Sequence, residues 1–239
     1  RHLQALIDKS LAYRRTDDNG HVVMLETTRD FALDELANAG EMEFTTAVLI
    51  DYAVELTTAA VGHLAGHEQG PWLDRLDLED DTLRAALGAS VAAGDADDAL
   101  TIAGNLWRYW WSRGVLSEGR TWLDRALSLA GEAVPSRRGL ALGGAAALAE
   151  SQGDFRRSVE LHLQALHLWQ AEQDLPGEAR ARSGLGTAAS HRGDFDVARE
   201  HHERALQISR TAGDRPGMAR TLDRLGTLDG VLGHAHPVR

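Results

Sequence analysis

The sequence repeats itself at an interval of 40 residues. Residues 152–155 read QGDF, and residues 192–195 read RGDF. Three further pairs share this offset: AL at 165–166 and 205–206, PG at 176–177 and 216–217, and LG at 185–186 and 225–226. RG at 113–114 and AL at 126–127 precede their counterparts by 39 positions, so an earlier, more divergent copy surrounds residue 113. Units of this length bury their apolar faces only against neighbouring units, which predicts a solenoid.

Each copy predicts two helices. A Gly-Asp-aromatic turn ends the first helix, and its aspartate can cap the second. Val159, Leu163, Leu166 and Trp169 recur at helical spacing and predict an amphipathic second helix. Pro176 then follows in the first turn of the next helix, where proline is tolerated. We therefore expect an all-α fold, with a helical-repeat solenoid over residues 96–239.

The first 40 residues follow a different pattern. Residues 1–10 fit the end of a helix, and residues 11–26 read as two short strands around Asn19-Gly20, a common hairpin turn. A helix follows, with Thr27 or Thr28 as its N-cap and Gly40 as its end. Helix, hairpin and helix in this order predict a small winged-helix remnant at 1–40. Residues 43–66 and 78–93 predict further helices in a linker over 41–95.

Composition excludes several classes of function. The net charge of −11 disfavours phosphate backbones as ligands, and the absence of cysteine excludes disulfides and thiolate zinc sites. No continuous apolar run approaches about 18 residues, so we expect no membrane span. The chain opens on RHLQALIDKS, which lacks the apolar core of a secretory signal and an initiator methionine. We expect a cytoplasmic protein, and a piece of a longer one.

The 40-residue unit resembles the tetratricopeptide repeat. In the copy anchored on GDF at 193–195, Leu185 and Gly186 match the Leu-Gly step of that family, and Ala198 and Ala205 match its two small packing positions. The usual unit has about 34 residues, so the extra residues lengthen the second helix and its turn. Trp107 stands where the family has glycine. The resemblance therefore implies that Trp107 and Trp110 hold the two helices of that copy apart.

Nearly the whole chain resembles the carboxy-terminal half of bacterial STAND-type regulators of the LuxR-like and AfsR-like kind. The motifs that carry this resemblance are LIDKSL, the hairpin, MLETTRDFALDEL, WLDRLDLEDDTLRAAL, the tryptophan-rich helix and the repeats, in that order. It implies a sensor or scaffold arm that contacts an ATPase domain of the same parent protein, with DNA bound through a separate effector domain. The phosphate-binding motif G-x-x-x-x-G-K-[ST] is absent here, so we expect no enzyme activity and no cofactor in this chain, with ATP and Mg²⁺ bound upstream.

In the resembled family, one stripe of each first helix lines a groove that binds partners. We expect a protein partner or a small effector in this groove. Within NLWRYWWSRG at 105–114, Tyr109 falls on an opposite buried strip, while Trp111 falls on the groove wall. The predicted stripe consists of Thr101, Gly104, Arg108, Trp111, Ser112, Glu150, Arg180, Ser183, Thr187, Ser190, His191, Arg220, Asp223 and Thr227.

Other interpretations remain open. Arg14 and Arg15 could contact DNA as a wing, which is the alternative function, and a solenoid enzyme would need a pocket with a perturbed acid or base. His63 and His67 have the i, i+4 spacing of metal ligands, but we favour a solvated helix end with Glu68 pointing elsewhere. We also expect surface or groove-edge positions for the adjacent His201 and His202, and the i, i+5 spacing of His162 and His167 does not suit a pair of metal ligands. An incomplete winged helix predicts unusual exposure of Leu3, Leu6, Ile7, Phe31 and Leu36.

Overall fold

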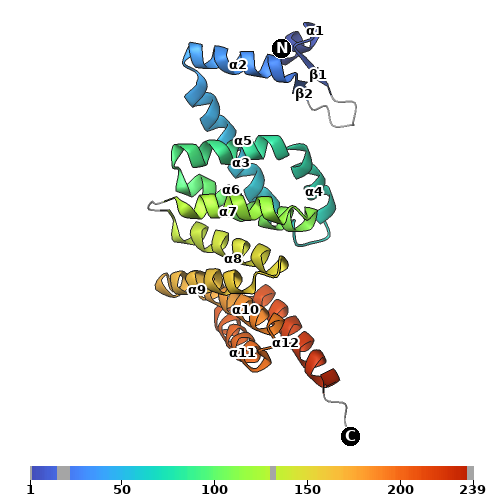
Figure 1. Cartoon of the computed structure of the whole chain (residues 1–239), viewed down its shortest axis with the longest axis vertical. Helices are drawn as coiled ribbons and strands as arrows, with labels where there is room; N and C mark the ends of the chain where they lie inside the picture. Colours follow the sequence, from blue (N-terminus) through green and yellow to red (C-terminus); the bar gives the residue numbers. More distant parts are fainter. Residues whose placement is uncertain (1, 15–21, 130–132, 236–239) are drawn as a thin grey trace. The chain divides into compact units, whose positions relative to one another are not determined.

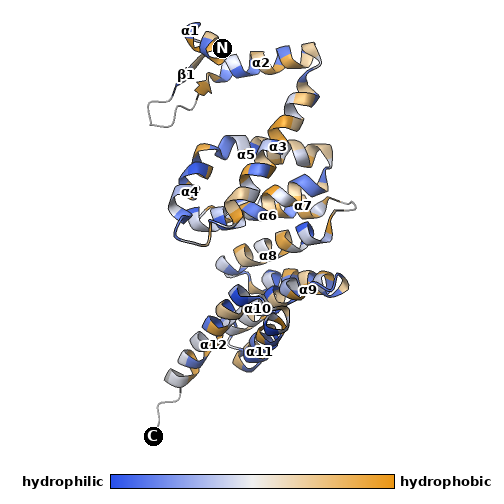
Figure 2. Cartoon of the chain, turned by 180° about the vertical axis from the view of Figure 1, so that it is seen from behind, coloured by the Kyte–Doolittle hydropathy of each residue, from blue (hydrophilic) through white to orange (hydrophobic). Residues whose placement is uncertain are grey.

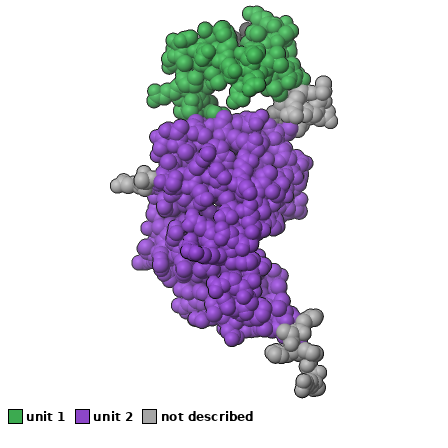
Figure 3. Space-filling model, in the orientation of Figure 1, with its two compact units in different colours: residues 1–49 green, residues 50–239 purple. Residues whose placement is uncertain are grey.

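A computed structural model describes residues 2–14, 22–129 and 133–235. Its contacts divide the chain into two compact units, residues 1–49 and residues 50–239 (Figure 3). Within the described residues, the protein is helical apart from one small hairpin (Figure 1). The expected all-α fold with a helical-repeat solenoid is confirmed.

The first unit begins with helix α1 (His2–Asp8) and an antiparallel pair, β1 (Ala12–Arg14) and β2 (Val22–Met24). Ala12 lies opposite Met24, which confirms the predicted hairpin, although its Asn19-Gly20 turn lies outside the described residues. Ala12 is the only buried residue among those of this unit that the structure describes, so the unit has almost no core of its own.

Helix α2 (Glu26–Ala39) ends at Gly40 as predicted, with Gly40 in the left-handed region at φ 71°. The predicted N-cap was wrong, because Leu25 holds that position without a side-chain bond and both candidate threonines lie inside the first turn. Glu26 in that turn complements the helix dipole. The expected exposure in this unit is confirmed: Phe31 is 65% exposed, Leu3 is also exposed, and Leu6, Ile7 and Leu36 are half-buried.

Helix α3 (Met42–Val61) runs from the first unit into the second. Within the described ranges, it is the one helix long and apolar enough to cross a membrane by length and composition. Asp51 and Glu55 lie within its apolar sequence, and core helices of soluble proteins pass the same test. The sequence-based expectation missed it by counting only continuous apolar runs.

Two further helices precede the repeats, α4 (Gln69–Leu78) and α5 (Asp80–Ala93). The predicted helix at 43–66 ends earlier, at Val61, and α4 was not predicted as an element. Pro71 lies in the first turn of α4, where proline costs no intrahelical hydrogen bond.

The repeats form three helix pairs and a final single helix (Figure 1). The first pair is α6 (Ala96–Arg113) with α7 (Leu116–Ser128), and the second is α8 (Pro135–Ser151) with α9 (Phe155–Ala171). The third is α10 (Leu175–His191) with α11 (Phe195–Ala212), followed by α12 (Arg215–Ala235). Each first helix packs against the first helix of the next copy, so α6, α8, α10 and α12 follow one another.

The turns of the repeats have a local cause. Gly114, Gly153 and Gly193 adopt positive φ, which favours glycine. The Asp154 carboxylate accepts a bond from the Arg157 amide at 3.2 Å and caps α9, whereas Asp194 caps α11 without such a bond.

The apolar faces of the repeat helices pack inward (Figure 2). On α9 the buried face carries Leu161, Ala165, Leu166 and Trp169. Leu163 was wrongly placed on this face and is 41% exposed. The helical spacing of Leu163 with Leu166 and Trp169 predicted an apolar face that is slightly rotated about the helix axis from the face that is buried.

Candidate functional site

The first helices of the repeats line a groove of about 540 Å³ in the second unit. That volume lies within the range of ligand sites, roughly 300–1,000 Å³. Equivalent positions on stacked helices face the same side, so residues far apart in the sequence come together. The residues of the predicted stripe that line the groove are Arg108, Trp111, Glu150, Arg180, Ser183, Thr187, Arg220 and Asp223.

The other members of the predicted stripe do not line this groove. The Ser112 hydroxyl accepts a bond from Gln69 Nε2 at 3.2 Å. The Ser190 and Thr227 hydroxyls donate to carbonyls of their own helices, at 3.1 and 2.9 Å. Thr101 and Gly104 face a smaller hollow that Val54 and Leu140 also line. These positions lie beyond the ends of the groove or turned away from it, which the helical wheel did not resolve.

His191 lies at the edge of the groove. Its Nε2 is 3.2 Å from Glu150 Oε1, and its ring stacks on Phe155 with centroids 5.2 Å apart. Burial raises the pKa of Glu150, while His191 and Arg224 oppose the rise. Glu150 is therefore already engaged by basic groups of its own chain.

The aromatic rings of the tryptophan-rich helix α6 differ in burial and in the residues they pack against. Trp110 is buried against Gly119 of α7, and Tyr109 is buried on the opposite side, as predicted. Trp107 was expected to hold α6 and α7 apart, but it packs on Gly144 of α8, where an added Cβ would lie 2.8 Å from it. The glycine of the next copy makes room for this ring, so Trp107 is not a wedge within the first copy.

Trp111 remains accessible in the groove. Its side chain is 51% exposed, and its Nε1 donates to the Ser151 hydroxyl at 2.9 Å. Trp111 lines the groove, and its role as a ligand contact stays a prediction.

The sequence analysis missed Trp169 as a groove residue. Its ring lies beneath Gly139 and Gly177, and the Arg180 guanidinium lies 5.6 Å from the ring centroid. The sequence does contain the two glycines that make room for this ring, one in each adjacent first helix. No sequence pattern near Trp169 indicates that these glycines pack against it.

Two histidines are buried, and the sequence analysis misplaced one of them. His202 is 1% exposed, and its ring packs against Gly186, although a surface or groove-edge position was predicted. His162 lines the groove floor at 7% exposure beside Gly184. Burial lowers the pKa of each to about 4, so both rings are neutral at pH 7. Glycines in the facing helices accept these rings.

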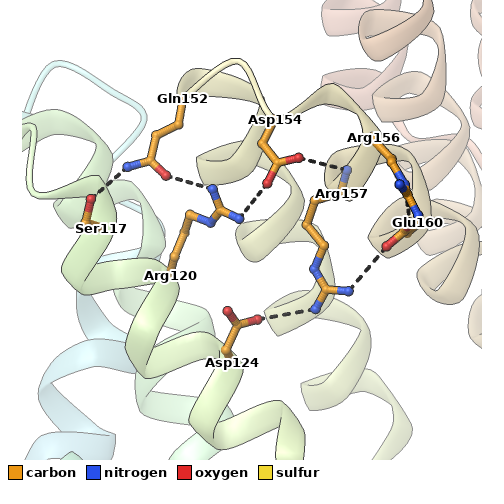
Figure 4. Close-up of polar contacts among 8 residues, drawn as sticks. All are labelled: Ser117, Arg120, Asp124, Gln152, Asp154, Arg156, Arg157 and Glu160. Carbon is orange, nitrogen blue, oxygen red and sulfur yellow. Dashed lines mark hydrogen bonds and ion pairs between the residues drawn. The ribbon is translucent and has the colours of Figure 1, made fainter.

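The arginines of the groove differ from those of the second helices. Between α7 and α9, Arg120 pairs with Asp154 at 2.8 Å, and Arg157 pairs with Asp124 at 3.4 Å (Figure 4). Within the groove, Arg108 lies over the Trp107 ring at 4.5 Å. Removal of water by the surrounding protein lowers the pKa of Arg108 and of Arg180, and Arg220 lowers both further by repulsion.

Two candidate sites from the sequence lie outside the groove: the histidines near residue 63 and the arginines of the predicted wing. His63 lies in the turn after α3, where it pairs with Glu68 and stacks on Trp72 at 4.8 Å. Glu68 therefore does not point elsewhere, as was expected. Among the described residues, no three His, Asp or Glu side chains gather as metal ligands. Arg14 is exposed on β1, and Arg15 lies outside the described residues, so the DNA-wing interpretation stays a prediction.

Comparison with known proteins agrees with the helical-repeat architecture. The sequence matches the tetratricopeptide repeat family over residues 137–211 and again over 177–234. A solved structure of BtubC (BKLC) from P. vanneervenii is 16% identical, with a TM-score of 0.44, and the match covers 81% of this chain and 94% of that one. The family match shows that the repeats over residues 137–234 are of the tetratricopeptide type.

Curated relatives come from mycobacteria. Proteins named "Putative HTH-type transcriptional regulator" in Mycobacterium bovis and Mycobacterium tuberculosis are 34% identical over 127 residues, which is 52% of this chain. The chain spans 14% of the length of these relatives. It is therefore an all-α protein with tetratricopeptide repeats and a distant similarity to bacterial transcription regulators.

Proposed function

We propose that this chain is a non-catalytic sensor or scaffold arm of a bacterial transcription regulator, and that its repeat groove binds a protein partner. The observation that carries the proposal is the groove itself, which gathers polar and aromatic side chains from α6, α8, α10 and α12. Tetratricopeptide repeats generally bind proteins, which supports a protein ligand over a small effector.

The arrangement of the parent protein belongs to the same proposal. Residues 1–40 are a winged-helix remnant, residues 41–95 are a helical linker, and residues 96–239 are the repeat arm. The arm contacts an ATPase domain of the same cytoplasmic protein, and a separate effector domain binds DNA. The similarity to much longer mycobacterial proteins named as putative HTH-type transcriptional regulators supports the regulatory role in this arrangement.

A groove-filling variant tests the proposed binding role. Ser183 lines the groove, so Ser183→Trp should block any occupant by volume, whatever its charge. Gln164→Trp is the matched control, because Gln164 is exposed on α9 and does not line the groove. We expect the wild-type chain and Gln164→Trp to capture the same protein from a bacterial lysate, and Ser183→Trp to lose it. Equal capture by all three chains would place the binding surface elsewhere.

A further inference from the structure

Two groove arginines lack carboxylate partners. Arg108 and Arg180 each lie over a tryptophan ring of the groove, and neither forms an ion pair among the described residues. Asp174 and Asp214 act on Arg180 only from beyond ion-pair distance. A ring face attracts a cation but leaves its N–H donors free for an anion.

The chain has carboxylates that could pair with these arginines. It contains 36 acidic and 25 basic residues other than histidine, so carboxylates are in excess. Outside the groove, some arginines of the repeats do form such pairs: Arg113 pairs with Asp74 at 2.9 Å, and Arg182 pairs with Glu178 at 2.8 Å. The groove therefore keeps positive charge that a nearby carboxylate could have cancelled.

A third arginine belongs to the same cluster. Arg220 on α12 is close enough to Arg108 on α6 and to Arg180 on α10 to lower the pKa of both by repulsion. The stacking of the repeats thus brings these three arginines, together with Arg224, to the lining of one hollow. An anion between them would relieve the repulsion and satisfy their free donors.

The acidic residues of the groove limit the kind of anion. Glu150 is held by His191, and Asp214 and Asp223 also line the groove. These carboxylates would repel a compact, multiply charged phosphate more strongly than single carboxylates spaced along a chain. Ser183 and Thr187 on α10 add hydroxyl oxygens that can accept bonds from the amides of an extended segment.

We propose that the groove binds an acidic segment of a partner protein, with carboxylates of that segment bound by Arg108, Arg180 and Arg220. This inference rests on the proposed binding role of the groove and states the chemistry of its occupant. Arginine is suited to the task, because its planar fork matches a carboxylate with two parallel hydrogen bonds.

The test uses a fluorescein-labelled, end-capped octaglutamate peptide and the whole chain. Fluorescence anisotropy at low salt should show saturable binding that weakens as salt rises. Replacing Arg108, Arg180 and Arg220 with glutamine should weaken it by about tenfold or more, since several charge-assisted bonds are lost. Arg180→Lys, which keeps the charge, should retain more binding than Arg180→Gln. Circular dichroism of each variant establishes that it is folded.

The chain offers a matched control for the arginine variants. Arg125 also lies over a tryptophan, Trp122, at 5.1 Å, but outside the groove. Arg125→Gln should bind octaglutamate as the wild type does. Absence of octaglutamate binding, equal weakening by Arg125→Gln, or equal binding of octaglutamine would overturn the inference. Displacement of the peptide by inorganic phosphate, but not by chloride of equal ionic strength, would identify a phosphate site and also overturn it.

The two proposals fail in different ways. If Ser183→Trp abolishes partner capture while the triple glutamine variant captures normally, the groove binds a protein but not through its arginines. If neither variant affects capture, the groove itself is not the binding surface.

Discussion

At the scale of single residues, two histidine side chains are buried and pack in the interior of the repeats. His162 and His202 occupy positions where a hydrophobic side chain would suit the core, and the Nδ1 atoms of both lack a hydrogen-bond partner among the described residues. Both rings are accommodated by glycines in neighbouring first helices. A polar ring in such a place is tolerated only while it remains neutral.

The lowered pKa of His162 predicts a loss of stability in mild acid. Its pKa is about 4 in the folded chain, against 6.5 for an unperturbed histidine, so the unfolded state binds more protons between these values. Stability is therefore complete above about pH 6.5 and falls as the pH drops toward 4. We expect His162→Gln to reduce the loss between pH 7 and pH 5 by about 1–2 kcal/mol. Urea unfolding at both pH values measures this.

His167→Gln provides the control for the acid prediction, because His167 is exposed on the same helix. The control should keep the pH dependence of the wild type. If His162→Gln loses as much stability in acid as the wild type does, His162 is not the residue that titrates.

At the scale of elements, α8 approaches its neighbours through glycines. Gly139 lies against the Trp169 ring of α9, where an added Cβ would lie 2.2 Å from Cζ2. Gly143, one turn later on the same helix, has nothing within 4 Å of such a Cβ. The two positions therefore separate the packing role of a glycine from its weak helix propensity.

This contrast predicts opposite effects of one substitution. Gly139→Ala should destabilise the chain by about 1–3 kcal/mol, because the Trp169 ring must move out of a packed position. Gly143→Ala should stabilise it by up to about 1 kcal/mol, because alanine favours the helix. Thermal or urea unfolding of the two variants compares them directly, and similar effects at both positions would argue against the close contact of α8 with Trp169.

At the scale of the whole molecule, the two units differ in how much they bury. In α2 no residue is buried, whereas α8 buries eight: Gly139, Ala141, Leu142, Gly144, Ala145, Ala146, Leu148 and Ala149. Local opening of a helix is easiest where few apolar contacts are lost.

Hydrogen exchange should therefore distinguish the units. We expect amides in the middle of α2 to exchange much faster than those in the middle of α8, although both are helical. Mass spectrometry of peptides from the two helices, after a series of exchange times, measures the difference. Comparable protection in α2 would mean that other contacts cover it in solution.

Local patterns were sufficient for much of the fold. The 40-residue period, Gly40 as a helix end, the hairpin strands and part of the predicted stripe depend on neighbours in the sequence or on equivalent positions in stacked repeats. Errors arose where the local sequence fitted more than one arrangement. This was so for the N-cap of α2 and for the exposed Leu163. It was also so for α4, a short helix that lies outside the repeats.

The sequence by itself therefore determined the repeat architecture and only part of the stripe that lines the groove, because helical periodicity gives the approximate face of a helix but not where the groove ends. Only the tertiary structure decided which glycine receives which ring and which arginines remain unpaired. Trp107 finds Gly144, and Arg108 comes near Arg220, through contacts between different copies. Such contacts depend on the rotation of one repeat against the next, which no short stretch of sequence encodes.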